Sequence, residues 1–136
     1  MSGTRRLSVL ASALALALAA PGLPAAWAKD APKLNTLTYT SFDALTATVF
    51  RSDGRRGVLT VQGGLDVKDA GLRARAAASQ PLLRDAYIRA LSVYAASLIP
   101  GSPPDVDQIG MRLQRATDAI LRRPGARVLL GTVLVN

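Results

Sequence analysis

The sequence predicts an α+β domain: a small, mostly antiparallel sheet with two main helices packed on one face. Three observations predict this class. Side chains alternate as in strands over the first half of the domain, apolar residues recur at helical spacing in the second half, and the chain ends on an apolar, β-branched segment. Strands followed by helices are typical of α+β domains, and the last strand must return to the sheet to bury its side chains. The expected order is β-β-β-α-α-β, with the first helix broken near Pro81.

Three strands are expected before the helices. Residues 34–40 (LNTLTYT) are rich in Thr and Tyr, and residues 43–50 (DALTATVF) alternate apolar and Thr side chains. Residues 58–67 alternate again after a polar, Gly-bearing turn, which predicts an antiparallel hairpin. Gly63 and Gly64 inside this strand predict a bulge or a strong bend.

The first main helix follows an Ala-rich segment. Residues 69–79 favour helix by propensity, and Ser79 followed by Pro81 predicts that the helix breaks and restarts at this point. The segment after the break has the clearest apolar stripe in the chain, formed by Leu83, Tyr87, Ala90, Leu91, Tyr94 and Leu98.

The second main helix is expected between two helix-breaking segments. It begins near Asp105 or Asp107, whose carboxylates suit a helix N-terminus, and it ends before Pro124-Gly125. Its predicted buried stripe consists of Val106, Ile109, Leu113, Ala116 and Ile120. Residues 127–135 (RVLLGTVLV) then predict a buried strand.

The N-terminal segment is typical of an export signal. Arg5 and Arg6 precede an apolar run over residues 7–20, which is shorter than the roughly 20 residues that span a bilayer. The small residues Ala26 and Ala28 predict cleavage after Ala28.

Three segments follow from this cleavage point: a signal peptide over 1–28, a flexible lead-in over 29–33 and the domain over 34–136. Sec and twin-arginine export both fit the signal, and both lead to the periplasm. In the alternative, the segment is not cleaved and anchors the protein in the inner membrane on the periplasmic face. A membrane is expected as a partner only in that case.

Composition excludes several chemistries. The chain of 136 residues has no Cys and no His, and all nine of its acidic residues are Asp. Disulfides, thiol nucleophiles, His-based triads and imidazole-ligated zinc are therefore excluded. We predict no catalytic, cofactor-binding or metal-ligating residue; a small hydrolase that uses Asp and Lys is the enzymatic alternative. Asp105 and Asp107 lack the rest of a calcium loop, so helix capping explains them better.

The net charge of +8 can indicate a nucleic-acid or anionic-lipid partner. The arginines are scattered, with no run longer than two, and they are not interleaved with stacking aromatics. Solvated faces explain them more simply, and no nucleic-acid partner is expected.

One segment resembles a known family. Residues 81–92 (PLLRDAYIRALS) resemble the P-x-I-R-D-x-I-x-x-x-L-S helix of the FliL family of flagellar basal-body-associated proteins. The positions that carry this motif are Pro81, Arg84, Asp85, Leu91 and Ser92. The flanks agree with the family in the hairpin, the second helix and the closing strand, at residues 41–66, 106–121 and 128–136.

The resemblance implies a periplasmic, non-enzymatic module that acts through protein–protein contacts, supports the flagellar motor or its stator, and forms homo-oligomeric rings. The Arg84-Asp85 helix would be a structural element of this module and not a catalytic site. The chain departs from the family at Phe50-Arg51, where an Asn is usual, and at Leu130-Gly131, where an aromatic is common. The alternative is an exported, envelope-associated binding module without a motility role.

Overall fold

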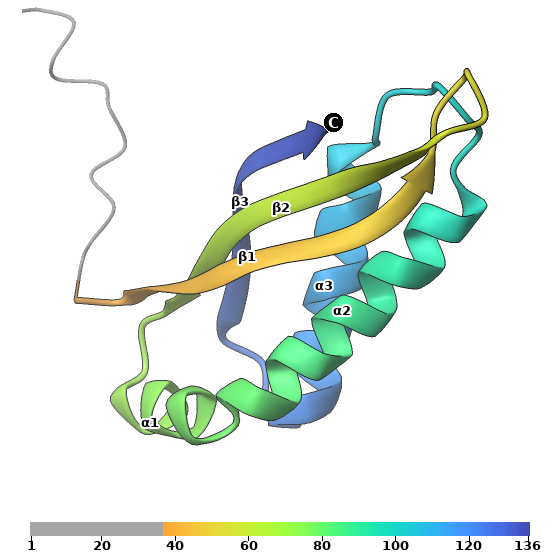
Figure 1. Ribbon diagram of the computed structural model, residues 1–136. Coiled ribbons are helices and arrows are strands. Elements are labelled where there is room, and N and C mark those ends of the chain that lie inside the picture. Colours follow the sequence, from red (N-terminus) through yellow and green to blue (C-terminus); the bar gives the residue numbers. More distant parts are fainter. Residues whose placement is uncertain (1–36) are drawn as a thin grey trace, which may run out of the picture. The chain divides into compact units, whose positions relative to one another are not determined.

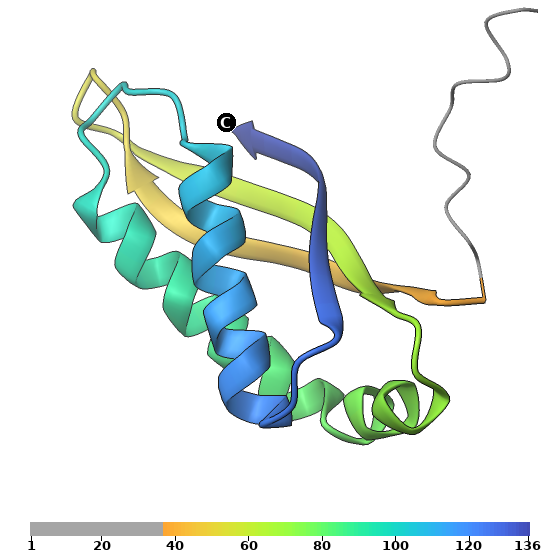
Figure 2. The same cartoon turned by 180° about the vertical axis from the view of Figure 1, so that it is seen from behind.

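The computed structural model describes residues 37–136, and Figure 1 shows how its elements are arranged. The strands are β1 (Tyr39–Phe50), β2 (Arg56–Val67) and β3 (Ala126–Val135). The helices are α1 (Ala70–Ala78), α2 (Gln80–Ser97) and α3 (Val106–Leu121). Both strand pairs are antiparallel, with β2 between β1 and β3. Helices α2 and α3 lie on one face of this sheet (Figure 2), which confirms the predicted α+β class.

The predicted signal peptide, its cleavage residues Ala26 and Ala28, and the lead-in lie outside the described residues.

The prediction of three strands before the helices is corrected to two. Tyr39 and Thr40 of the segment expected at 34–40 and all of the segment expected at 43–50 belong to the single strand β1, and Leu37 and Thr38 form a turn before it. Ser41 is compatible with a turn, but Ser41 and Phe42 both pair with β2, opposite Gly64 and Gly63, so the chain stays extended there. The pairing with β2 shifts register between Phe42 and Leu45, which is a strand irregularity rather than a turn.

The predicted bend at the paired glycines is confirmed. Gly63 lies opposite Phe42 at the register shift of β1, and the pairing with β3 shifts between Gln62 and Gly63. A Cβ atom on Gly63 would collide with the carbonyl oxygen of Leu129 and approach Phe42 Cζ to 3.0 Å. Only a residue without a side chain allows both neighbours to come this close to β2.

The core lies between the sheet and the helices. On β1 and β2 it contains Leu45, Val49, Leu59, Val61, Leu65 and Val67. The predicted stripe on α2 is confirmed at Leu83, Tyr87, Leu91 and Tyr94, all of which are buried. Phe42 packs against Tyr87 with ring centroids 5.4 Å apart, so the bent part of the sheet meets the middle of α2.

The stripe on α3 differs from the prediction. The buried residues are Ile109, Leu113, Thr117 and Leu121. Val106 is 46% exposed, and Ala116 and Ile120 are only partly buried. Thr117 can occupy this buried position because its hydroxyl forms a hydrogen bond with the buried Tyr87 hydroxyl of α2.

That contact is a buried hydrogen-bond relay. The Thr117 hydroxyl donates to the carbonyl oxygen of Leu113 at 2.8 Å, so its single proton is used. The Tyr87 hydroxyl therefore donates to Thr117 Oγ1 at 2.7 Å. Burial raises the pKa of the Tyr87 phenol above 10.0, so the neutral, donating form is retained.

Helix termini confirm most of the capping predictions. Asp105 is the N-cap of α3, and its carboxylate accepts from the backbone N–H of Gln108 at 3.0 Å. The backbone N–H of Asp105 donates to the Tyr94 hydroxyl at 2.6 Å, which ties the start of α3 to α2. Ser79 is the N-cap of α2 but makes no side-chain capping bond.

We predict that Gly63→Ala destabilises the domain by about 1–3 kcal/mol or more, because the new methyl group must displace strand backbone. The matched control is Gly110→Ala in α3, where the new Cβ would lie 3.8 Å from Leu130 Cδ1 in ordinary contact. This control should gain about 0.5–1 kcal/mol from helix propensity. Urea unfolding midpoints test both; equal effects of the two substitutions would contradict the close-approach argument.

We predict that Thr117→Val costs about 1–3 kcal/mol, since it leaves the buried Tyr87 hydroxyl without an acceptor. Adding Tyr87→Phe removes the orphaned hydroxyl, so the double variant should be more stable than the sum of the two single losses predicts. A double-mutant cycle of unfolding free energies measures the coupling. Strict additivity would show that the two hydroxyls do not interact.

Candidate interaction surfaces

The closing strand β3 is an edge strand and not the buried strand that its apolar composition predicts. It pairs with β2 on one side, and within residues 37–136 no strand pairs with its other side. Leu134 is 48% exposed and Val135 is 40% exposed. The reason is the small sheet: with helices on one face only, the last strand keeps an open edge and an open outer face.

A side chain covers the first part of this edge. Gln114 of α3 donates from Nε2 to the carbonyl oxygen of Ala126 at 2.8 Å. Its Oε1 atom accepts from the backbone N–H of Val128 at 2.9 Å. The amide thus takes the place of a neighbouring strand at the beginning of β3.

The second part of the edge remains open. Asn136 exchanges both backbone hydrogen bonds with Val58, at 2.9 and 3.1 Å. Directly opposed residues alternate between hydrogen-bonded and non-hydrogen-bonded pairs, so Val133 and Val135 turn their N–H and C=O groups away from β2. The described part of the chain supplies no second strand for these groups.

The two sheet edges differ in how they resist further pairing. Natural edge strands are usually blunted by charges, proline, bulges or short length. The edge strand β1 carries Asp43, whose carboxylate lies 3.4 Å from Arg84, and an irregularity follows Phe42. Residues 128–135 have no charge and no proline, and Gly131 in the register shift is their only interruption.

The outer face of the sheet is polar with a few apolar side chains. Its polar members include Thr46, Thr48, Gln62 and Thr132, all exposed. The apolar members near the hairpin end are Val58, Leu134 and Phe50, exposed to 46%, 48% and 55%. A partner strand on β3 would also meet this face.

A pocket of about 610 Å³ lies between β1, the end of β2 and the helices α1 and α2. Apolar side chains such as Phe42 and Leu83 form much of its lining, and its ionisable groups belong to Asp43, Arg73, Arg84 and Tyr87. Guanidinium groups stay protonated in proteins, and the carboxylate is paired with Arg84. The pocket can hold an apolar group, with the Asp43–Arg84 pair and the guanidinium of Arg73 in its lining.

The residues of the FliL-like motif are spread over α2. Pro81 lies in the first turn, and Leu91 is buried. Arg84 contacts Asp43, Asp85 pairs with Arg89 one turn later, and Ser92 is exposed. The motif residues therefore do not converge on one site; they mark a helix with one buried and one solvated face.

Within the described part of the chain, no three His, Cys, Asp or Glu residues are grouped to hold a metal ion. Over residues 37–136 we find no helix with the length and apolar character needed to span a membrane.

Two features of β3 were not predicted from the sequence. Gln114 covers the first part of its edge, and the second part of the edge is open. The available signal was the low number of strands, since a sheet this small leaves its last strand at an edge. Comparison of the chain with protein-family models, with curated proteins and with solved structures found no match.

Proposed function

We propose that this protein is an exported, FliL-like module of the periplasm that acts without catalysis, through protein–protein contacts on the open edge of β3. One observation supports this most directly: the backbone groups of Val133 and Val135 face outward from the uncharged part of β3, residues 128–135. An extended segment of a partner can add to such an edge through main-chain hydrogen bonds. We propose flagellar stator or basal-body proteins as the partners, on the strength of the helix motif at residues 81–92.

Self-association on the same edge gives two distinguishable assemblies. Pairing of β3 with β3 of a second copy is isologous and stops at a dimer. Pairing of β3 with β1 of the next copy is heterologous and closes into a ring if the rotation per copy permits. A ring around a stator unit requires the second arrangement, which would leave β1 as well as β3 buried.

We predict that Val135→Pro weakens partner binding at least about tenfold. Proline removes the outward N–H and its ring obstructs a neighbouring strand, while the bonds to β2 are made by other residues. The control is Val135→Thr, which has nearly the same shape and keeps the N–H. Each variant, expressed as the full chain, is used to capture stator and basal-body proteins from solubilised envelopes, and thermal melting verifies the fold.

The motility role has its own test in a deletion strain. Loss of the gene should reduce swimming in soft agar, and the wild-type chain and Val135→Thr should restore it where Val135→Pro does not. Normal swimming of the deletion strain would contradict the motor role. If edge-dependent self-association persisted in that case, the envelope-associated module without a motility role would be the better proposal.

A further inference from the structure

Basic residues that are scattered in the sequence gather at one end of the fold. This end contains the start of β1, the end of β2, α1, the end of α3 and the start of β3 (Figure 1). We call the following residues the basic end: Lys68, Arg73, Arg75, Arg122, Arg123 and Arg127. Arg73 is partly buried and the other five are exposed.

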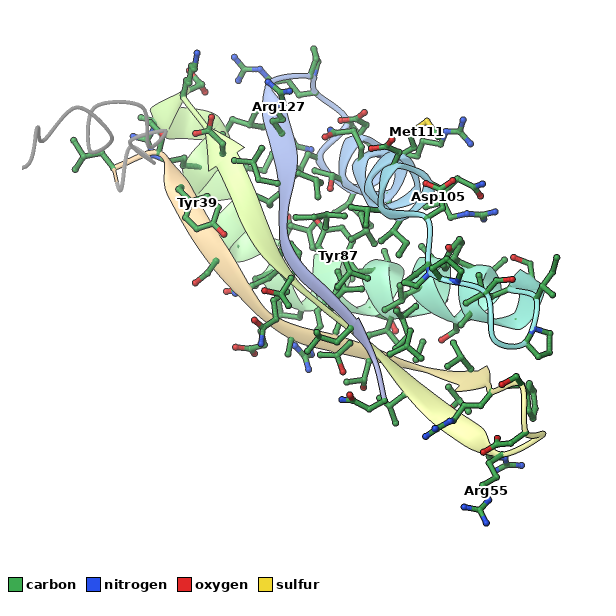
Figure 3. The ribbon with its side chains drawn as sticks, turned by 90° about the horizontal axis from the view of Figure 1, so that it is seen from above. Tyr39, Arg55, Tyr87, Asp105, Met111 and Arg127 are labelled. Atoms are coloured by element: carbon green, nitrogen blue, oxygen red, sulfur yellow. The ribbon has the colours of Figure 1, made fainter. Side chains whose placement is uncertain are left out.

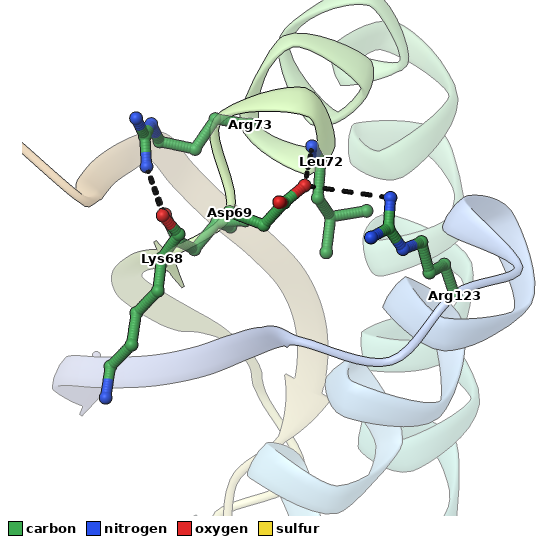
Figure 4. Close-up of polar contacts among 6 residues, drawn as sticks. Lys68, Asp69, Leu72, Arg73 and Arg123 are labelled. Carbon is green, nitrogen blue, oxygen red and sulfur yellow. Dashed lines mark hydrogen bonds and ion pairs between the residues drawn. The ribbon is translucent and has the colours of Figure 1, made fainter.

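Four polar contacts order these segments. The guanidinium of Arg123 lies 3.6 Å from the carboxylate of Asp69, which joins the end of α3 to the start of α1 (Figure 4). The same carboxylate accepts from the Leu72 N–H at 2.7 Å and so caps α1. Arg73 donates to the carbonyl oxygens of Val67 at 2.9 Å and Lys68 at 2.8 Å.

The charge is uneven along the molecule. The basic end has six cationic residues, and the acids on the same segments are Asp66, Asp69 and Asp118. The opposite end, where the β1–β2 hairpin adjoins the α2–α3 loop, balances Arg51, Arg55 and Arg56 against Asp53, Asp105 and Asp107. Figure 3 shows Tyr39 and Arg127 toward one end of the sheet and Arg55 at the other. The basic end thus has an excess of three positive charges and the hairpin end has none, while Arg112 and Arg115 add two along α3 between them.

The chain also enters the domain at the basic end. Tyr39, the first residue of β1, pairs with Asp66 near the end of β2, and Leu37 before it is 81% exposed. The apolar run at residues 7–20 has the character of a segment that enters a membrane, whether as a signal or as an anchor. In the sequence this segment precedes β1, whose first residue lies at the basic end.

From the charge asymmetry and the chain entry together, we infer that the basic end docks onto an anionic phospholipid surface. Lysine and arginine near such a surface are attracted to its headgroups, and the attraction decays within a Debye length. Residues 66–76 and 118–128 contain no aromatic side chain, and the one aromatic at the start of β1, Tyr39, lies against Gly64. A row of aromatics on which successive bases could stack is therefore not formed by these segments, so single-stranded nucleic acid fits less well. This inference uses none of the residues of the open β3 edge and does not depend on the partner proposed for it.

The test compares two triple variants of the full chain that lose the same charge. The first is Lys68→Gln/Arg122→Gln/Arg127→Gln at the basic end. The second, at the hairpin, is Arg51→Gln/Arg55→Gln/Arg56→Gln. None of the six side chains makes an ion pair or a side-chain hydrogen bond among residues 37–136, so both variants should fold; thermal melting verifies this. Because both retain the same N-terminal segment, any insertion of that segment contributes equally to their binding.

Binding is measured by co-sedimentation with vesicles of phosphatidylcholine alone and of phosphatidylcholine with phosphatidylglycerol. We expect the wild type and the hairpin variant to prefer the anionic vesicles at about 0.05 M salt and to lose the preference at about 0.5 M. We expect the basic-end variant to bind the anionic vesicles roughly a hundredfold more weakly, at about fivefold for each lost charge.

Two results would overturn the inference. Equal losses for the two triple variants would mean that total charge, and not its position, sets the affinity. In a parallel measurement with a DNA duplex, a defect of the basic-end variant toward DNA but not toward vesicles would assign this surface to nucleic acid instead.

Discussion

The close approach of β1 and β3 to Gly63 is the constraint on which the rest of the fold depends. Both register shifts of the sheet occur at this residue, and Phe42 comes over it to reach Tyr87. Tyr87 in turn donates to Thr117, so the bent strand, α2 and α3 meet through one continuous set of buried contacts. A side chain at Gly63 would push β1 and β3 away from β2 and would loosen the aromatic contact as well as the sheet. Within the described residues the sheet has the order β1-β2-β3 and is not closed, so β1 and β3 are its edges.

Local periodicity was sufficient to predict most of the elements, because each depends on residues near in sequence. The stripe under Tyr87, the cap at Asp105 and the bend at Gly63 are all local features. The strand count failed between Phe42 and Leu45, where the chain has an irregularity in pairing and no turn, because pairing depends on a strand elsewhere in the chain. The burial of Thr117 was missed because a hydroxyl is compatible with a core only when a partner is present. Residues 127–135 were predicted to form a buried strand because they are apolar. Composition does not show whether a strand has one neighbour or two, and β3 has only one within the described residues.

The clustering of charged side chains is even harder to predict from the sequence, because it depends on contacts between distant segments. Arg73 and Arg123 are fifty residues apart in the chain, and yet both contact the segment that leads into α1. Arg73 donates to the carbonyl oxygen of Lys68, and Arg123 pairs with Asp69. The residues of the basic end are not contiguous in the sequence. The turn from α3 into β3, at residues 122–127, lies beside the segment that leads from β2 into α1. Solvated faces were a reasonable explanation of scattered arginines, and they remain so for those near the middle of α2 and α3. The difference between the two ends of the domain becomes visible only when the topology brings the segments together.

The two proposed surfaces lie at different positions along one strand. β3 begins beside Arg127 in the basic end and runs away from it, so Val135 lies about 25 Å further along at the rise of an extended chain. This separation exceeds the Debye length of about 8 Å at physiological salt, so removing charge at the basic end should leave the electrostatics of the open edge nearly unchanged. Gln114 closes the part of the edge nearer to the basic end, and the open part is the far one. A domain that rests on headgroups through its basic end would therefore present its free backbone groups away from the membrane, where a strand of a periplasmic partner can reach them.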